Sequence, residues 1–257
     1  MTQIAIFITG MAVAFISTLF GLGGGIIMVP ILSLILPYSH LEAVATSLMT
    51  IVLVASLNTY NFNRKKVIVW SVVPWIALTS SIFAFTSAQF STRIPEKLLI
   101  LIFICFLLWV AIRTFLIKSD GGFTEKREHT KLIPLGIGTV SGLISGVTGI
   151  GGGGITTPLM LVSRLVKNIE AAPTSNAIMV FTALFGSLSF AMTDYQATGY
   201  ITLGYIHLDT ALLLFAGSAV FSRIGVRINQ DIPLFWRKTV LAFLLLIICI
   251  RLIFIVI

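Results

Sequence analysis

FGLGGGIIMVP (residues 20–30) and TGIGGGGITTP (residues 148–158) are two copies of one glycine-rich cluster, aligned without a gap at a sequence offset of 128. Glycine is unfavourable within a helix, and it is used where the backbone bends or where another group approaches it closely. Both clusters lie inside apolar sequence. We therefore predict that the chain interrupts a helix at two equivalent places.

The composition predicts a membrane protein, because 57% of the residues are hydrophobic and only 10% are charged. A helix of about 20 residues crosses the ~30 Å hydrocarbon layer of a bilayer. Apolar runs of that length predict six membrane-spanning helices, at residues 41–62, 67–88, 98–117, 168–192, 204–226 and 239–257. Residues 1–20 contain no Lys or Arg, so they lack the basic region of a cleavable signal peptide, and we expect them in the mature protein.

The net charge of +8 comes from basic residues that lie between the apolar runs, a distribution that indicates membrane topology rather than nucleic-acid binding. Cys105 and Cys249 fall within predicted helices without the spacing of a metal or disulfide site, so we expect them to be packing residues. We expect His40, His129 and His207 in or beside loops and exposed to solvent. The sequence therefore indicates no cofactor, no metal site and no catalytic residue.

The repeat extends beyond glycine. The offset of 128 also relates Ser17 to Ser145, Glu42 to Glu170, Thr46 to Thr174 and Ser47 to Ser175. Later in each half the offset becomes 138, as for Ser80 and Ser218, so the second half has gained about ten residues, most simply around 194–205. We predict a first transmembrane repeat at 1–118, a cytoplasmic linker at 119–130 and a second transmembrane repeat at 131–257.

The distribution of basic residues decides how the repeats are oriented. If each glycine cluster is the apex of a hairpin of two short helices, one side of the membrane collects fourteen basic residues and the other three. The larger set is Arg64, Lys65, Lys66, Arg113, Lys118, Lys126, Arg127, Lys131, Arg164, Lys167, Arg223, Arg227, Arg237 and Lys238, and the smaller is Arg93, Lys97 and Arg251. Basic residues are enriched on the cytoplasmic side. This favours inverted repeats with both termini outside the cytoplasm.

The predicted fold is therefore an all-α polytopic membrane protein with two inverted repeats. Each repeat has a re-entrant helix hairpin, broken at a glycine cluster, and three full transmembrane helices. The helix after each cluster, at 25–37 and 153–165, has about 13 residues and spans only about 20 Å. Such half-helices would bring both glycine turns to the middle of the bilayer.

A helix N-terminus presents unpaired N–H groups and a partial positive charge, so it can hold an anion without a charged side chain. We predict a site for a small oxyanion such as sulfite, sulfate or a sulfonate, with hydroxyl and amide donors completing the shell. Its residues are Gly23, Gly24, Gly25, Thr46, Ser47, Gly151, Gly152, Gly153, Thr174, Ser175 and Asn176. The alternative is close helix packing by small residues, with the hydroxyls bonded to backbone.

GLGGGIIMVP followed by EAVATS, and GIGGGGITTP followed by EAAPTSNA, resemble the motifs of the TauE/SafE sulfite exporter family of membrane permeases. The resemblance covers essentially the whole chain. It implies transport of sulfite, sulfonates or other small anions, with export as the expected direction. The matching positions are Gly21 to Gly25, Pro30, Thr46, Ser47, Gly149 to Gly153, Pro158, Thr174 and Ser175. One departure from symmetry is Ala45, where the second half has Pro173.

The sequence thus predicts a membrane transporter that moves its anion by alternating access, in a bacterial inner membrane. Its expected partners are the anion and the lipid bilayer, with homo-oligomers left open and no nucleic acid. A passive anion channel is the alternative. An intramembrane enzyme using Ser141 or Ser145 is disfavoured because no general base is visible. We expect Glu42 and Glu170 to stabilise helix starts, and Arg113 and Arg251 to reach the membrane interface.

Overall fold

The structure is a computed structural model and describes residues 6–13, 25–36, 38–116, 130–195, 201–229 and 234–256. Its described part is helical except for one short β-hairpin, so the all-α prediction is confirmed with that addition. A helix at 6–13 precedes α2 (Gly25–Ile35), α3 (His40–Arg64), α4 (Val73–Ser91) and α5 (Glu96–Leu116). The second half contains α6 (Leu132–Thr148), α7 (Gly153–Val162), α8 (Asn168–Ala191), β1 (Thr202–Leu203), β2 (Ile206–His207), α9 (Leu208–Asn229) and α10 (Leu234–Val256).

The helix bounds follow the offsets found in the sequence. The first residues of α2 and α7, and those of α3 and α8, are related by the offset of 128, whereas those of α5 and α10 are related by the offset of 138. β1 lies within residues 194–205, where the second half was predicted to have gained residues, and β2 directly follows them. Each of the six predicted spans overlaps a helix of 19 residues or more, α3, α4, α5, α8, α9 or α10.

The first helix of each half packs closely against a helix of the other half. Gly10 in the helix at 6–13 lies against the backbone of Leu214 in α9. Gly138 in α6 lies in the same way against the backbone of Ile76 in α4. These two contacts are related by the two offsets, 128 and 138, so the halves exchange equivalent contacts, as a two-fold relation requires.

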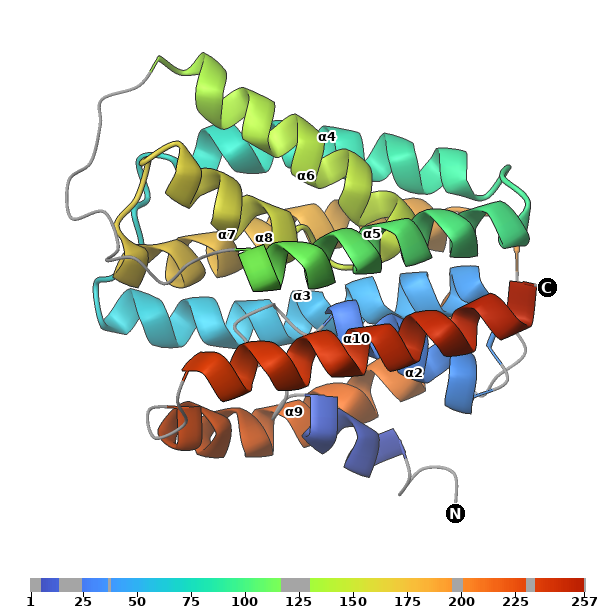
Figure 1. The fold of residues 1–257 in the computed structure, drawn as a ribbon. Helices are drawn as coiled ribbons and strands as arrows, with labels where there is room; N and C mark the ends of the chain where they lie inside the picture. Colours follow the sequence, from blue (N-terminus) through green and yellow to red (C-terminus); the bar gives the residue numbers. More distant parts are fainter. Residues whose placement is uncertain are drawn as a thin grey trace.

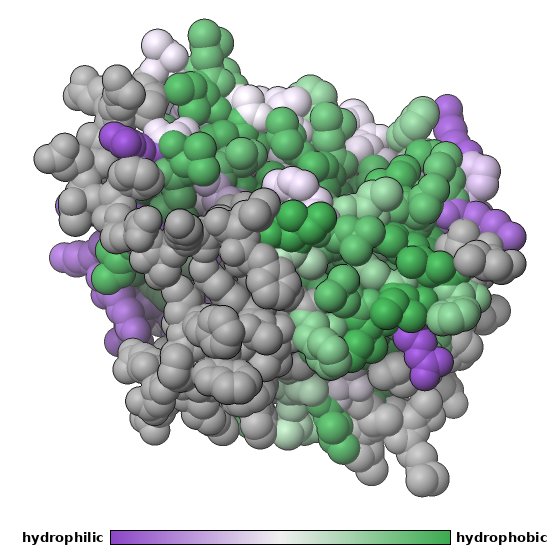
Figure 2. All heavy atoms as spheres, viewed as in Figure 1, coloured by the Kyte–Doolittle hydropathy of each residue, from purple (hydrophilic) through white to green (hydrophobic). Residues whose placement is uncertain are grey.

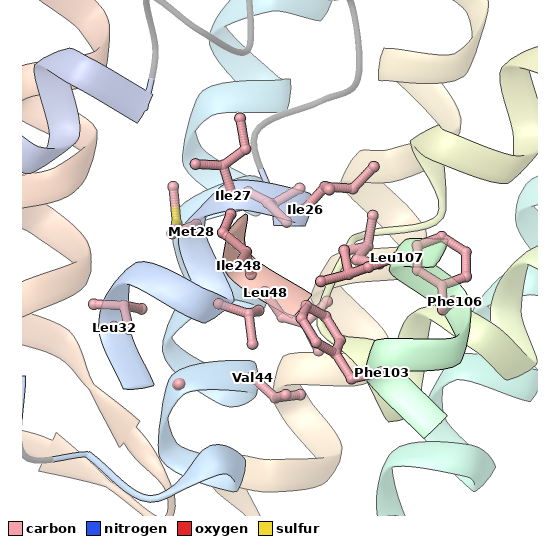
Figure 3. Close-up of a cluster of buried hydrophobic side chains, with 14 of the residues drawn as sticks. Ile26, Ile27, Met28, Leu32, Val44, Leu48, Phe103, Phe106, Leu107 and Ile248 are labelled. Atoms are coloured by element: carbon pink, nitrogen blue, oxygen red, sulfur yellow. The ribbon is translucent and has the colours of Figure 1, made fainter. Parts of the chain in front are cut away.

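The exchange produces two helical bundles that differ from the sequence halves. The helix at 6–13 with α2, α3 and α9 makes up one, called bundle A, and α4, α6, α7 and α8 make up the other, called bundle B. The bundles meet where α3 packs against α8. The helices α5 and α10, which belong to neither bundle, pack against each other (Figure 1). The half-helix α2 is enclosed by protein, with Ile26, Val29 and Leu32 fully buried. Figure 3 shows its side chains among those of α3, α5 and α10.

The outer surface is suited to lipid. α8 exposes Phe181, Leu184, Phe185 and Leu188, which recur at helical spacing, and α5 and α10 expose similar side chains. Among the coloured residues of Figure 2, hydrophobic ones cover the centre and right of the visible face, and most hydrophilic ones lie toward its left and right edges. Within the described residues, α3 and α8 are each long and apolar enough to cross a membrane by length and composition.

The contact between α6 and α4 gives a test of the close packing. A Cβ at Gly142 would lie 2.8 Å from the Cα of Ser80 and nearer still to its carbonyl oxygen, whereas a Cβ at Gly136 on the same helix would meet nothing within 4 Å. We expect Gly142→Ala to lower the free energy of unfolding by about 1–3 kcal/mol through overpacking. Gly136→Ala should instead raise it by about 0.5–1 kcal/mol, because alanine favours a helix. SDS denaturation in mixed micelles measures both, and equal effects would contradict the packing.

Candidate functional site

The second glycine cluster forms a tight turn between two short helices. α6 ends at Thr148 and is followed by Gly149, which has φ 73°, and α7 begins after Gly152, which has φ 82°. Gly151 between them has φ 71°. These backbone angles lie in the left-handed region that residues with a Cβ avoid, so the turn depends on glycine. Gly23 and Gly24 of the first cluster lie outside the described residues, and Gly25 is the first residue of α2.

The start of α2 lies directly against this turn. A Cβ on Gly25 would be 2.7 Å from the Cα of Ile150 and 3.0 Å from the carbonyl oxygen of Gly149. The two glycine-rich segments, far apart in the sequence, therefore meet at Gly25. Their contact leaves no room for a side chain.

Two large side chains at equivalent positions close the space around the turn. Ile51 of α3 lies against both Gly25 and Gly151. Met179 of α8, its counterpart at the offset of 128, lies against Gly151 and Gly153. The turn is thus held between α3 and α8, the helices at which the bundles meet.

The N-terminus of α7 has backbone donors available. The N–H groups of Ile155 and Thr156 both donate to the carbonyl oxygen of Gly152, at 3.0 and 2.9 Å. The N–H groups of Gly153 and Gly154 have no backbone acceptor among the described residues. All of these residues are buried. Free N–H groups at a helix start carry a partial positive charge, so this end of α7 can receive an anion.

Ser47 and Ser175, equivalent in the repeat, differ in their partners. Each lies one turn before Ile51 or Met179, on the helix face that meets the glycine turn. The Ser47 hydroxyl donates to the carbonyl oxygen of Gly149 at 3.0 Å. The Ser175 hydroxyl is buried, with 1% of the residue exposed, and has no hydrogen-bond partner among the described residues. Ser175 therefore has an unused donor beside the turn.

Thr46 and Thr174 bind backbone of the opposite half instead. The hydroxyl of Thr46 accepts from the N–H of His207 at 3.1 Å, and that of Thr174 accepts from the N–H of Val69 at 3.1 Å. The two hydrogen bonds are equivalent under the offsets of 128 and 138. Each threonine fastens the segment before α9 or α4 to its own bundle. Their hydroxyl oxygens are therefore already used to hold segments from opposite halves of the chain together.

Asn176 also has protein partners. Its amide donates to the carbonyl oxygen of Ala172 at 2.8 Å and accepts from the Asn58 amide at 3.3 Å. Of the predicted site residues, the structure therefore brings Gly25, Ser47 and Gly151 to Gly153 together, with Ser175 on the adjoining helix face. Their part in anion binding stays a prediction.

A separate cavity of about 790 Å³ lies between α4, α5, α6 and α7. Its lining is dominated by apolar side chains such as Phe90, Phe106, Trp109 and Leu143, and Phe90 and Trp109 are exposed on the molecular surface. Its lining includes no charged side chain among the described residues. The lining is suited to hydrocarbon and not to an anion, so we do not assign the anion site there.

A polar cluster missed by the sequence analysis lies where α3 begins. The prediction that His40 and His207 are exposed is wrong, because both residues are only 2% exposed; His129 lies outside the described residues. His207 was missed because its burial depends on the hairpin formed by the extra residues of the second half. The only sequence signal was a histidine directly after that insertion.

Glu42 is the centre of this cluster. One carboxylate oxygen accepts from the Ser39 N–H at 2.7 Å, while the Ser39 hydroxyl accepts from the Glu42 N–H at 3.3 Å. This capping box confirms that Glu42 stabilises a helix start. Glu170 accepts from the Lys167 N–H at 2.9 Å, and the interpretation is confirmed there too. The other oxygen of Glu42 accepts from the Tyr195 hydroxyl at 3.2 Å and lies 3.5 Å from Nε2 of His207.

Comparison with known proteins identifies relatives along nearly the whole chain. The family model described as Sulfite exporter TauE/SafE matches residues 6–252. A probable membrane transporter protein of Methanocaldococcus jannaschii is 29% identical over 233 residues, which cover 88% of this chain and 85% of the relative. Two probable membrane transporter proteins of Haemophilus influenzae are 28% identical over 95% of both chains and 32% identical over 82% of both chains. No solved structure matches.

The two serines provide a matched test of the geometry. Ser47→Ala removes the donor to the Gly149 carbonyl oxygen and should lower the free energy of unfolding by about 1–2 kcal/mol, because a buried acceptor loses its partner. Ser175→Ala removes a hydroxyl without a partner among the described residues and should change the free energy by less than about 0.5 kcal/mol. SDS denaturation of the ligand-free protein measures both. A loss at Ser175 as large as that at Ser47 would mean that Ser175 has a structural acceptor.

Proposed function

This chain belongs to the sulfite exporter TauE/SafE family and is an integral membrane transporter of that type, and from this premise we propose that it exports a small oxyanion such as sulfite or an organosulfonate. We assign it to a bacterial inner membrane, where the negative interior drives anions outward. A potential of 100 mV is worth about 2.3 kcal/mol for each charge. Export down this gradient requires no coupling ion.

The observation that carries the proposal is the buried start of α7. The N–H groups of Gly153 and Gly154, without a backbone acceptor among the described residues, supply donors and a partial positive charge, and the start of α2 at Gly25 adjoins them. The hydroxyl of Ser175, which has no hydrogen-bond partner in the described part of the chain, supplies a further donor on the adjoining face of α8. An anion with several oxygens can accept from all three.

The positions of the described Lys and Arg side chains also favour a site made of uncharged donors. Every Lys and Arg whose side chain the structure describes is exposed, so none of these cations reaches the glycine turn. A full charge at the bilayer centre costs at least about 2.5–3.5 kcal/mol on insertion scales, whereas helix N–H groups belong to the fold already. Weak, uncharged binding also permits release, which transport requires.

We propose that the two halves are inverted repeats and that the moving bodies are bundles A and B. The exchanged contacts at Gly10 and Gly138 support a two-fold relation, and the fourteen-to-three division of basic residues supports inversion. Movement along the contact of α3 with α8 would open the anion site to each side in turn. The hydrogen bond from Asn58 to Asn176 crosses that contact, and the one from Ser47 in α3 reaches Gly149 in the turn between α6 and α7. Both would change with the movement.

Transport can be measured with purified protein in liposomes loaded with sulfite or an alkanesulfonate. We expect saturable efflux under an inside-negative potential. In Ser175→Ala the half-saturating concentration should rise about tenfold, the loss of one hydrogen bond to a charged group. Gly136→Ala is the control, since a Cβ at that position would touch nothing. Absence of flux for every sulfur oxyanion would overturn the proposal, and single-channel currents would replace the carrier with a channel.

A further inference from the structure

The cluster around Glu42 and His207 contains a titratable pair that the proposed transport path does not use. The His207 ring is buried and stacks on Tyr38, with ring centroids 4.0 Å apart. Its Nε2 has no hydrogen-bond partner among the described residues, yet it lies 3.5 Å from a carboxylate oxygen of Glu42. If the ring were protonated, a small movement would bring this nitrogen into an ion pair with the carboxylate. Unpaired buried polar atoms of this kind call for an explanation.

The pairing of Glu42 with His207 is not explained by a structural role that both halves share. The capping box recurs at Glu170, and the N–H of Val69 makes the same hydrogen bond as that of His207. Yet the counterpart of His207 is Val69 and that of Tyr38 is Val166, neither of which titrates. Among the described residues, a histidine ring and a carboxylate therefore meet at only one of the two equivalent places, at Glu42 and not at Glu170. The residues gained by the second half supply the rest of the cluster.

The cluster also joins the two bundles at this end. Tyr195 follows α8 of bundle B, and its hydroxyl donates to Glu42 in α3 of bundle A. Tyr195 stacks on Tyr205 with centroids 4.0 Å apart, and Phe190 of α8 meets Tyr205 edge to face. His207 itself lies in β2, which precedes α9 of bundle A, but Gly204 and Tyr205 of the same hairpin lie against Phe190 of α8, and the Tyr205 N–H donates to the Phe190 carbonyl oxygen at 3.4 Å. An attraction between His207 and Glu42 would therefore hold α3 to the end of α8 through this hairpin.

We propose that Glu42 and His207 form a proton-binding site which, when His207 is protonated, locks the end of the molecule at which α3 begins and slows transport. The inference rests on the transport function proposed above. Protonation adds one N–H donor to the ring, which the Glu42 carboxylate accepts as an ion pair. Histidine is the residue that changes charge between about pH 5 and pH 8.

The other titratable groups nearby do not compete for the proton. Burial and then the Glu42 charge raise the pKa of Tyr195 and of Tyr205, so both phenols stay neutral. Burial also raises the pKa of Tyr38, whose hydroxyl is paired with Thr210 at 2.7 Å.

The remaining groups are His40 and two carboxylates with partners of their own. Glu96 of α5 accepts from the His40 N–H at 2.6 Å, and Asp209 of α9 accepts from the Thr210 N–H at 2.8 Å. The His40 ring packs edge to face on Phe103 and has no hydrogen-bond partner among the described residues. Within the described part of the chain, Glu42 is the carboxylate that approaches His207.

The first experiment measures efflux in liposomes at equal pH on both sides and constant potential. As pH falls from about 8 to about 5.5, we expect wild-type transport to slow about fivefold, in the usual range of coupling between two sites. His207→Phe keeps a ring against Tyr38, and Glu42→Gln keeps an acceptor, so both should fold and lose this pH dependence. Glu170→Gln, the matched change at the opposite end, should keep it. Dividing the rates of His207→Phe and Glu42→Gln by the rate of Glu170→Gln at the same pH removes the effect of any titration of the anion itself.

The second experiment needs no transport. The thermal midpoint of the wild type minus that of His207→Phe should rise as pH falls, because the proposed ion pair forms only in the folded protein, where Glu42 lies 3.5 Å from the ring. Tyr195→Phe should keep this rise but speed transport at low pH, because it removes the hydrogen bond between the bundles. A constant difference overturns the proton site, even if anions are carried. A rising difference without anion flux leaves the proton site standing and rejects the proposed cargo.

Discussion

The structure depends on one constraint, that backbone polar groups within a bilayer must be bonded or enclosed by protein. The turn at residues 149–152 interrupts a helix and leaves N–H groups at the start of α7 without a backbone acceptor among the described residues. Ile51, Met179 and the start of α2 surround this turn, so protein encloses it as the constraint requires. The same enclosure that makes the broken helix possible also keeps lipid away from its donors. In the proposed transporter, the binding site is therefore a direct result of how the break is stabilised.

Close packing of small residues makes this enclosure possible. Gly138, Gly142 and Gly146 allow α6 to approach the backbone of α4, a helix from the other half of the chain. Hydrophobic burial gives little drive between helices in lipid, so such contact and interhelical hydrogen bonds supply the stability. Thr46 and Thr174 then fix the segments that lead into the exchanged helices. Neither half can complete its own bundle, which makes duplication a requirement of the fold.

Helix positions could be predicted because their signals are local. Length, apolar runs and the glycine clusters predicted the helices and the break at Gly149 to Gly152, and the change of offset located the gained residues without predicting that a hairpin forms there. Partners could not be predicted, because they depend on which helices exchange. Thr46 and Ser47 look alike in the sequence, yet one accepts from backbone near α9 and the other donates to the glycine turn. His207 looked like a loop residue and lies buried beside Tyr38 and Glu42, which are distant in the sequence.

The contacts that repeat in both halves and the cluster around Glu42, which does not repeat, have different consequences for transport. In the proposed carrier, two equivalent half-helices around one site would give no preferred direction, since each end would open with similar ease. The gained residues break that equivalence, because Tyr195 and Tyr205 join His207 in a carboxylate-centred cluster over α3, whereas Val69 and Val166 stand in place of His207 and Tyr38 at the equivalent position. An interaction present at only one end changes the relative populations of the two open states. Regulation could thus be added to a duplicated transporter by a short insertion, without altering the glycine turn.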